Sequence, residues 1–98
     1  MVTIDAIEGI VNGVIAYHYD VGDDVLYLRL QSHRDAKTLG EETEDGLILL
    51  RDERDDEPVG LTIVNWWKRF GENQLPDSIQ AIQKRIEPLA TKLNNLAA

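Results

Sequence analysis

Three aspartates and a histidine form a short segment with residue types suited to metal chemistry. Asp20, Asp23 and Asp24 fall within five residues, and His18 lies two positions before them. Carboxylate oxygens are the ligands that calcium and magnesium prefer, and an imidazole nitrogen can also bind a metal. A metal-dependent hydrolase or ligand-binding enzyme is therefore one alternative for this segment. The spacing does not fit an EF-hand loop, and closely spaced aspartates commonly form turns, so the metal site is only a weak candidate.

The remaining candidates for catalysis are sparse. The run Ser32-His33-Arg34-Asp35 holds the three residue types of a hydrolase triad, but neighbours in one loop cannot adopt the triad geometry. The chain has no cysteine and no glycine-rich phosphate-binding motif. We therefore assign no catalytic residue, expect no cofactor, and favour a non-enzymatic protein.

The charge of the chain is strongly negative and concentrated in its middle. The net charge is -8, and residues 35–57 hold ten acidic residues against three basic ones. Such a surface repels phosphate groups, so we expect no nucleic-acid partner. A basic protein partner fits this charge, although an acidic segment can also serve only to keep a small domain soluble.

Length and hydropathy predict a single cytoplasmic domain. The 98 residues suffice for one modest core, and no apolar run approaches the ~20 residues that cross a bilayer, so we expect no membrane contact. Asp5 and Glu8 near the start are unlike the basic end of a signal peptide. The absence of cysteine is compatible with a reducing compartment.

Alternating apolar residues predict an antiparallel sheet over residues 14–64. Two pairs of segments show strand patterns, each pair joined by polar or turn-forming residues, and residues 31–46 read as a polar connection between the pairs. The expected fold is α+β, a β-meander of about four strands covered on one face by a C-terminal helix. The expected strands are 14–19, 25–30, 47–50 and 59–64.

The two ends of the chain show helical spacing. Residues 1–12 carry Ile4, Ile7, Ile10 and Val11 at roughly helical intervals, which predicts a short N-terminal helix. Residues 65–98 form the expected helical extension. Within it, residues 65–70 predict a short helix with Asn65 as a cap and Gly71 at its stop.

A longer helix is expected after Pro76, with a seam of isoleucine and leucine at intervals of three and four. Pro88 falls outside this seam and predicts a kink, or a division into two shorter helices. The seam can pack on the sheet of its own chain or against a second copy. Its members are Ile79, Ile82, Ile86, Leu89, Leu93 and Leu96.

The adjacent residues Trp66 and Trp67 complete the candidate contact surface. Adjacent side chains on a helix point about 100° apart, so both rings cannot face one core. An exposed tryptophan is a frequent anchor of protein interfaces. We therefore expect a protein-interaction module, a homo-oligomer or a partner of a basic protein, with its contacts at Trp66, Trp67, Ile79, Ile82, Ile86, Leu89 and Leu93.

Residues 17–64 resemble the bacterial domain of unknown function 2283. The resemblance rests on the hairpin residues Tyr19-Asp20 and Asp24 to Leu28, which include Leu26 and Tyr27, on the strand Glu44-Asp45-Gly46-Leu47-Ile48-Leu49, and on Val59-Gly60-Leu61-Thr62-Ile63. It implies a compact α+β domain on an antiparallel meander and no established activity.

The resemblance also implies an antitoxin-like role, as the partner of a small basic protein. The chain departs from the family pattern at two acidic positions. Leu49 or Leu50 stands where an aspartate is frequent, and Thr62 stands where a glutamate is frequent. A carboxylate site shared with that family is therefore not expected here.

Overall fold

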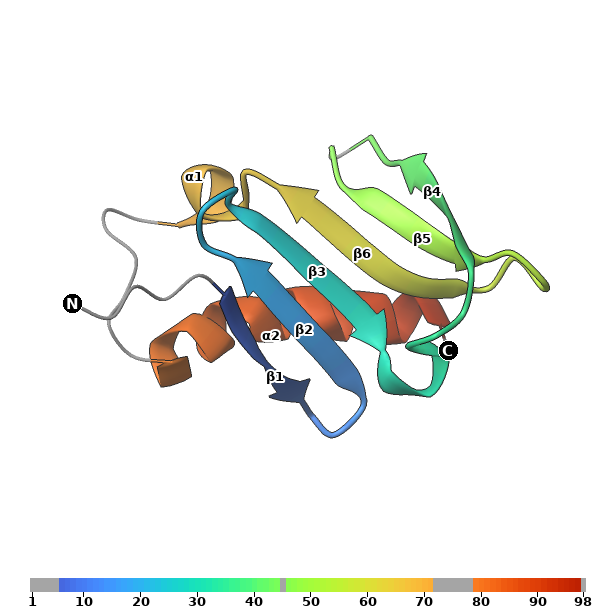
Figure 1. Cartoon of the computed structure of the whole chain (residues 1–98), viewed down its shortest axis with the longest axis horizontal. Coiled ribbons are helices and arrows are strands. Elements are labelled where there is room, and N and C mark those ends of the chain that lie inside the picture. The colour runs from blue at the N-terminus through green and yellow to red at the C-terminus, as the bar shows by residue number, and fades with distance from the viewer. Residues whose placement is uncertain (1–5, 45, 72–78, 98) are drawn as a thin grey trace.

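The computed structural model describes residues 6–44, 46–71 and 79–97, with side chains described for 82–95 of the last range. A helix lies behind a twisted antiparallel sheet of six strands (Figure 1). The α+β class and the covering C-terminal helix are thereby confirmed. The elements are β1 (Ala6–Val11), β2 (Ile15–Asp20), β3 (Val25–Leu30), the 3-10 turn η1 (Gln31–His33), β4 (Thr38–Glu42), β5 (Ile48–Asp52), β6 (Pro58–Val64), α1 (Trp66–Phe70) and α2 (Ile79–Ala97).

The strand order is β1-β2-β3-β6-β5-β4, with every neighbouring pair antiparallel. The sheet is therefore two three-stranded meanders, β1 to β3 and β4 to β6, joined through β3 and β6. The sequence indicated about four strands in simple succession, and both the number and the order were wrong. After β3 the chain crosses to the far edge as β4 and returns through β5 and β6, so β3 pairs with the last strand and not with the next.

The predicted N-terminal helix is wrong over its described part, because Ala6–Val11 is the edge strand β1. Asn12 and Gly13 follow it with φ of 56° and 70°, the left-handed region that tight hairpin turns require. The turn returns the chain into β2 with Val11 opposite Ile15. Pairing with β2 therefore determines the structure of this segment, and Ile4 lies outside the described residues.

The fourth strand lies inside the segment predicted to be a polar connection. Thr38–Glu42 pairs with β5, with Gly40 opposite Leu50 and Glu42 opposite Ile48. Most of its side chains are exposed, so the strand shows none of the alternation that a half-buried strand shows. Hydrogen bonding to β5 defines this edge strand, and the sequence carries little trace of it.

One face of the sheet forms the core together with α2. Buried side chains stand in three rows across the strands, and α2 packs against β6 and β1 on this face. Tyr17 lies directly over Gly9, where a Cβ atom would come within 2.5 Å of its hydroxyl. The rows are Val11–Ile15–Leu30, then Gly9–Tyr17–Leu28–Leu61–Leu49, and Ile7–Tyr19–Leu26–Ile63.

The long helix continues through Pro88 without a break, from Ile79 to Ala97. Pro88 is exposed, so its ring lies on the side of α2 away from the sheet. Of the two alternatives open from the sequence, a continuous helix is the one observed. The backbone hydrogen bond lost at a proline is tolerated here because the opposite side of α2 is anchored in the core.

Candidate functional site

Asp24 connects the hairpin β2–β3 to the short helix α1. Its Oδ1 accepts hydrogen bonds from the Tyr19 hydroxyl at 2.7 Å and from the Trp67 backbone N–H at 2.8 Å. Its Oδ2 accepts one from the Lys68 backbone N–H at 3.1 Å. Asn65 does occupy the cap position of α1, but its side chain makes no cap bond, so the predicted capping role belongs to Asp24.

The other members of the acidic segment serve the same turn. The Asp20 carboxylate accepts a hydrogen bond from the Asp23 backbone N–H at 3.0 Å. His18 contacts Glu8 on the neighbouring strand through its Nδ1. No group of three or more histidine, aspartate or glutamate side chains within the described ranges is arranged to hold a metal ion. Of the carboxylates proposed as weak metal ligands, those of Asp20 and Asp24 are therefore engaged in a turn and a helix cap.

Burial and the Asp24 carboxylate act together on Tyr19. Both raise the pKa of the Tyr19 hydroxyl well above its usual range, burial being the larger cause. The ring packs edge-on against Trp66, with 4.8 Å between centroids. Tyr19 is thus a neutral hydrogen-bond donor inside the core. Of the other hairpin residues, Leu26 also lies in the core, and Tyr27 points to the opposite face.

The two tryptophans occupy different environments. Trp66 is 1% exposed, while Trp67 is half-buried beside it and under the Arg85 guanidinium, 5.8 Å from its ring centroid. A Cβ atom at Gly71 would overlap the Trp67 ring, so a larger residue at the end of α1 would displace that ring. Trp66 is therefore a core residue, and Trp67 is the more accessible of the pair.

The apolar residues of α2 pack against the sheet of their own chain. Ile82, Ile86 and Leu93 are buried, as is Ala90, while Leu89 is half-buried. The side chains of Ile79 and Leu96 lie outside the described residues. Of the two alternatives for this seam, packing within the chain is the one observed. A side chain at this depth cannot reach a partner unless α2 leaves the sheet, which removes Trp66, Ile82, Ile86 and Leu93 from the accessible contact surface.

The opposite face of the sheet, here called the open face, is covered by no described helix or strand (Figure 1). Cross-strand partners share a face, so the registers arrange its side chains in rows. Ile10 is 49% exposed, Tyr27 44% and Val64 45%. The rows are Ile10–Ala16–Arg29–Gly60–Leu50–Gly40, then Glu8–His18–Tyr27–Thr62–Ile48–Glu42, and Ala6–Asp20–Val25–Val64.

A shallow cavity of about 440 Å³ lies on the open face. The small side chain of Ala16 stands between two large neighbours in its row, Ile10 and Arg29, and all three line the cavity. Tyr27 and the guanidinium-bearing Arg34 also line it. The lining therefore combines apolar side chains with the charged residues Glu8, Arg29 and Arg34.

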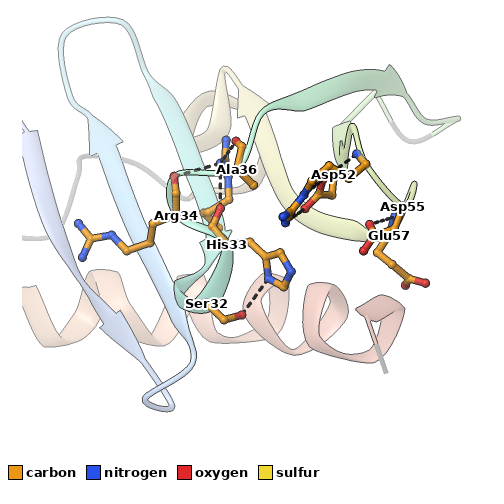
Figure 2. A network of polar contacts seen from close by, with 9 residues as sticks. Ser32, His33, Arg34, Ala36, Asp52, Asp55 and Glu57 are labelled. Carbon is orange, nitrogen blue, oxygen red and sulfur yellow. Dashed lines mark hydrogen bonds and ion pairs between the residues drawn. The ribbon is translucent and has the colours of Figure 1, made fainter.

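The position of Arg29 is fixed by the loop that follows β3. Its Nη1 donates to the backbone carbonyls of His33, Arg34 and Ala36 at 3.2, 3.3 and 3.2 Å (Figure 2). These three hydrogen bonds hold the guanidinium in one position at the sheet surface. The open face therefore carries a well-placed Arg29 side chain.

A second cavity, of about 680 Å³, lies between the η1 loop and the β5–β6 turn. A dashed line in Figure 2 joins Ser32 Oγ and His33 Nδ1, which are 2.8 Å apart. Asp52 is 1% exposed, and its carboxylate is bound by the Arg54 side chain at 3.2 and 3.0 Å. Hydrogen bonds from Arg54 lower the pKa of Asp52 to about 2.

This second cavity does not present an assembled catalytic relay. Both oxygens of Asp52 bind Arg54, and no described hydrogen bond joins that carboxylate to His33. Arg34 points away from His33 and Asp52 in Figure 2. The Asp52–Arg54 salt bridge anchors the β5–β6 turn, and the exposed contact between Ser32 and His33 lies next to it.

Comparison with known proteins gives no relative from which a function can be inferred. No family model, curated protein or solved structure matches the chain. No helix among residues 79–97 or the other described ranges is long and apolar enough to span a membrane. The resemblance to the bacterial domain of unknown function 2283 stays a prediction.

Sequence reasoning missed the open face as a surface. Ile10 was assigned to a helix, and Ala16 and Leu50 were placed in strands without regard to which face they occupy. The signal that could have located β1 is the pair Asn12-Gly13, a strong hairpin indicator next to an apolar segment. With β1 in place, the alternation along the strands would have brought Ile10, Ala16 and Tyr27 to one face.

Proposed function

We propose that this protein is a non-enzymatic protein-interaction module whose contact surface is the open face of the sheet. The observation that carries the proposal is the one-sided cover: α2 buries one face, while Ile10, Tyr27 and Val64 remain exposed on the other. Large apolar side chains gathered on one face are typical of interaction sites in small proteins. Tyrosine and arginine, both present here, are enriched in such interfaces.

The proposal changes the residues first expected to make the contact. Trp66 and the α2 residues Ile82, Ile86 and Leu93 stabilise the chain from within. Their burial supports a rigid two-layer scaffold, which presents the open face in one fixed conformation. Rigid presentation lowers the entropic cost of binding and suits a recognition surface.

The alternative of a metal-dependent enzyme has less support. Asp20 already accepts a hydrogen bond within the turn, and Asp24 accepts hydrogen bonds from α1. A metal ion would have to break these hydrogen bonds. A partner of basic character is compatible with the net charge of -8. Most of that charge, however, lies on residues 35–57 and not on the apolar part of the open face.

Site-specific photo-crosslinking tests the proposal. A photoreactive benzoylphenylalanine replaces Tyr27 on the open face, and in a control protein it replaces the exposed Glu87 on α2. In cells of the source organism we expect a discrete adduct from position 27 that unmodified protein competes away, and none from position 87. Adducts from neither position, or equally from both, would contradict a contact surface on this face.

A further inference from the structure

The edge strand β4 directs half of its backbone groups away from the sheet. β4 ends the strand order, with β5 as its neighbour (Figure 1). At its two ends, the Thr43 N–H donates to the Leu47 carbonyl at 2.7 Å, and the Glu53 N–H donates to the Lys37 carbonyl at 2.9 Å. Hydrogen-bonded pairs alternate with non-hydrogen-bonded pairs in an antiparallel ladder. The odd-numbered residues from 37 to 43 therefore direct their backbone groups to β5, and the even-numbered residues direct theirs outward.

The outward-facing residues of β4 are Thr38, Gly40 and Glu42. Each presents its backbone N–H and its carbonyl oxygen along the free edge of the sheet. No backbone hydrogen bond within the described parts of the chain engages these groups, and Gly40 and Glu42 are exposed. A row of unpaired donors and acceptors on a regular strand is a template for one further strand.

Exposed acidic residues surround this edge. Glu41 and Glu42 lie in β4 itself, and Glu44 follows its end. The β5–β6 turn, residues 53–57, lies beside the start of β4 and holds four more acidic residues, all exposed (Figure 1). The free backbone groups of β4 therefore lie in a negative potential, which attracts a cationic partner.

The basic residues of this region do little to neutralise it. Residues 35–57 hold ten acidic and three basic residues. Arg51 pairs with Glu41 at 3.1 Å, and Arg54 pairs with Asp52 at 3.0 Å. Without these two pairs, eight acidic residues and one basic residue remain. The charge that complements this edge is therefore positive.

We infer that the free edge of β4 binds a basic, extended segment of another protein, which adds to the sheet as a seventh strand. The inference goes beyond the proposed function, because this edge and the open face are different surfaces. Every observed strand pair is antiparallel, and an antiparallel seventh strand continues that arrangement.

The side chains of β4 define the sequence that fits. Directly opposite side chains on paired strands interact, and opposite charges stabilise such pairs. Lysine or arginine therefore belongs opposite Glu42 and opposite Glu41. Leu39 is 61% exposed, so an apolar side chain belongs opposite it. In an antiparallel strand, this pattern is two adjacent basic residues with an apolar residue two positions after the second.

A second copy of the chain does not have this character. Its own β4 would bring the same acidic segment to the edge, and charged edge strands are a common means by which sheets avoid pairing with each other. The opposite edge strand, β1, holds a single acidic residue, Glu8, and packs against α2. The charge argument therefore applies to β4 and to a basic strand.

A synthetic peptide of the expected pattern tests the charge requirement. The end-capped peptide Lys-Thr-Lys-Lys-Val-Ile-Val-Thr places its lysines beside Glu44, Glu42 and Glu41, and its isoleucine opposite Leu39. Fluorescence anisotropy of the labelled peptide gives its dissociation constant. The same peptide with glutamate for each lysine should bind at least tenfold more weakly, because attraction becomes repulsion.

Two variants of the protein locate the charges that matter. Glu41→Gln/Glu42→Gln should raise the dissociation constant of the basic peptide roughly threefold or more. Asp23→Asn/Glu87→Gln removes the same number of exposed charges away from β4, so it is the matched control and should have a smaller effect. Equal effects of the two double variants would overturn the assignment to this edge.

Backbone methylation separates strand addition from attraction by charge alone. The peptide valine opposite Gly40 directs its N–H at β4, so N-methylation there should weaken binding roughly tenfold or more, because it removes a donor and blocks the approach. The isoleucine opposite Leu39 directs its N–H away, and N-methylation there should change the dissociation constant far less. Equal effects of the two methyl groups would overturn strand addition.

Amide hydrogen exchange, measured by NMR, reports on the protein side of the contact. The basic peptide should slow exchange at Thr38, Gly40 and Glu42, whose N–H groups face outward. Unchanged exchange at these three amides, or no binding of the basic peptide, would overturn the inference. Neither result bears on the photo-crosslinking at position 27, so failure here and failure of the open face are distinguishable.

Discussion

Asp24 joins two parts of the molecule that are far apart in the sequence. It lies in the turn before β3 with φ of 55°, a left-handed conformation that aspartate and asparagine tolerate better than most residues. From there its carboxylate accepts hydrogen bonds from Tyr19, Trp67 and Lys68. A residue that looks like a metal ligand in the sequence is therefore a structural link between β2, β3 and α1.

Two replacements of Asp24 should distinguish the hydrogen bonds of its carboxylate from the left-handed backbone conformation at its position. We expect Asp24→Ala to lower the free energy of unfolding by ~2–3 kcal/mol, because the Tyr19 hydroxyl and two N–H groups lose a charged acceptor. Asp24→Asn should cost less, since asparagine tolerates the left-handed conformation and keeps one acceptor oxygen. Urea unfolding of both variants provides the measurement, and equal stability of Asp24→Ala and the wild type would show that the link is dispensable.

Asp52 makes part of the stability dependent on pH. Its pKa in the folded protein is about 2, below the ordinary value of 3.8, because Arg54 binds the ionised form. A lowered pKa means that the stabilisation is complete above about pH 4 and is lost as the pH falls towards about 2. We expect the stability difference between wild type and Asp52→Asn to shrink over this interval. Thermal melts of both proteins between neutral pH and about pH 2 provide the measurement. A stability difference that stays constant over this range would argue against this role.

At the scale of single elements, the sequence predicted three of the half-buried strands, β2, β3 and β6, and missed β1. β3 was located with the observed ends, and β2 and β6 lie within one residue of the predicted ends. These strands carry alternating side chains because one side contacts α2 and the other faces the open side. The pattern arises directly from burial, so it can be read without a structure.

The features that the sequence did not predict depend on the pairing between strands. β4 is exposed on both sides and owes its conformation to hydrogen bonds with β5. The pairing of β3 with β6 brings together strands separated by more than twenty residues, and nothing local to either strand specifies it. For the same reason, the side chains of the open face could not be assigned to one surface from the sequence, whereas the apolar stripe of α2 could.

The helix α2 makes its main contribution through the core. Ile86 is 0% exposed, so Ile86→Ala removes buried side-chain volume and should cost ~2–5 kcal/mol of unfolding free energy. The adjacent exposed residue provides a control, because Glu87→Ala should change stability by less than about 0.5 kcal/mol. At native conditions the Ile86→Ala protein should keep the mass of the wild type. A variant that dissociates without loss of stability would instead place this side of α2 at the interface.

For the whole molecule, the charge distribution sets the conditions of association. Each copy carries a net charge of -8, so two copies repel each other at long range. The acidic residues of β4 lie at one edge of the sheet, and Glu8 lies on β1 at the other edge. A contact between two copies must therefore overcome this repulsion through short-range interactions.

Salt should consequently weaken the repulsion between two copies. The Debye length falls from ~10 Å at 0.1 M to ~3 Å at 1 M salt, which screens this repulsion while leaving short-range contacts between side chains. We expect self-association, measured by sedimentation equilibrium, to be stronger at 1 M than at 0.1 M sodium chloride. The variant Glu44→Gln/Glu53→Gln removes two exposed charges, so it should associate more readily at 0.1 M salt and respond less to added salt. Association that weakens with salt would mean that attraction between opposite charges outweighs the net repulsion between copies.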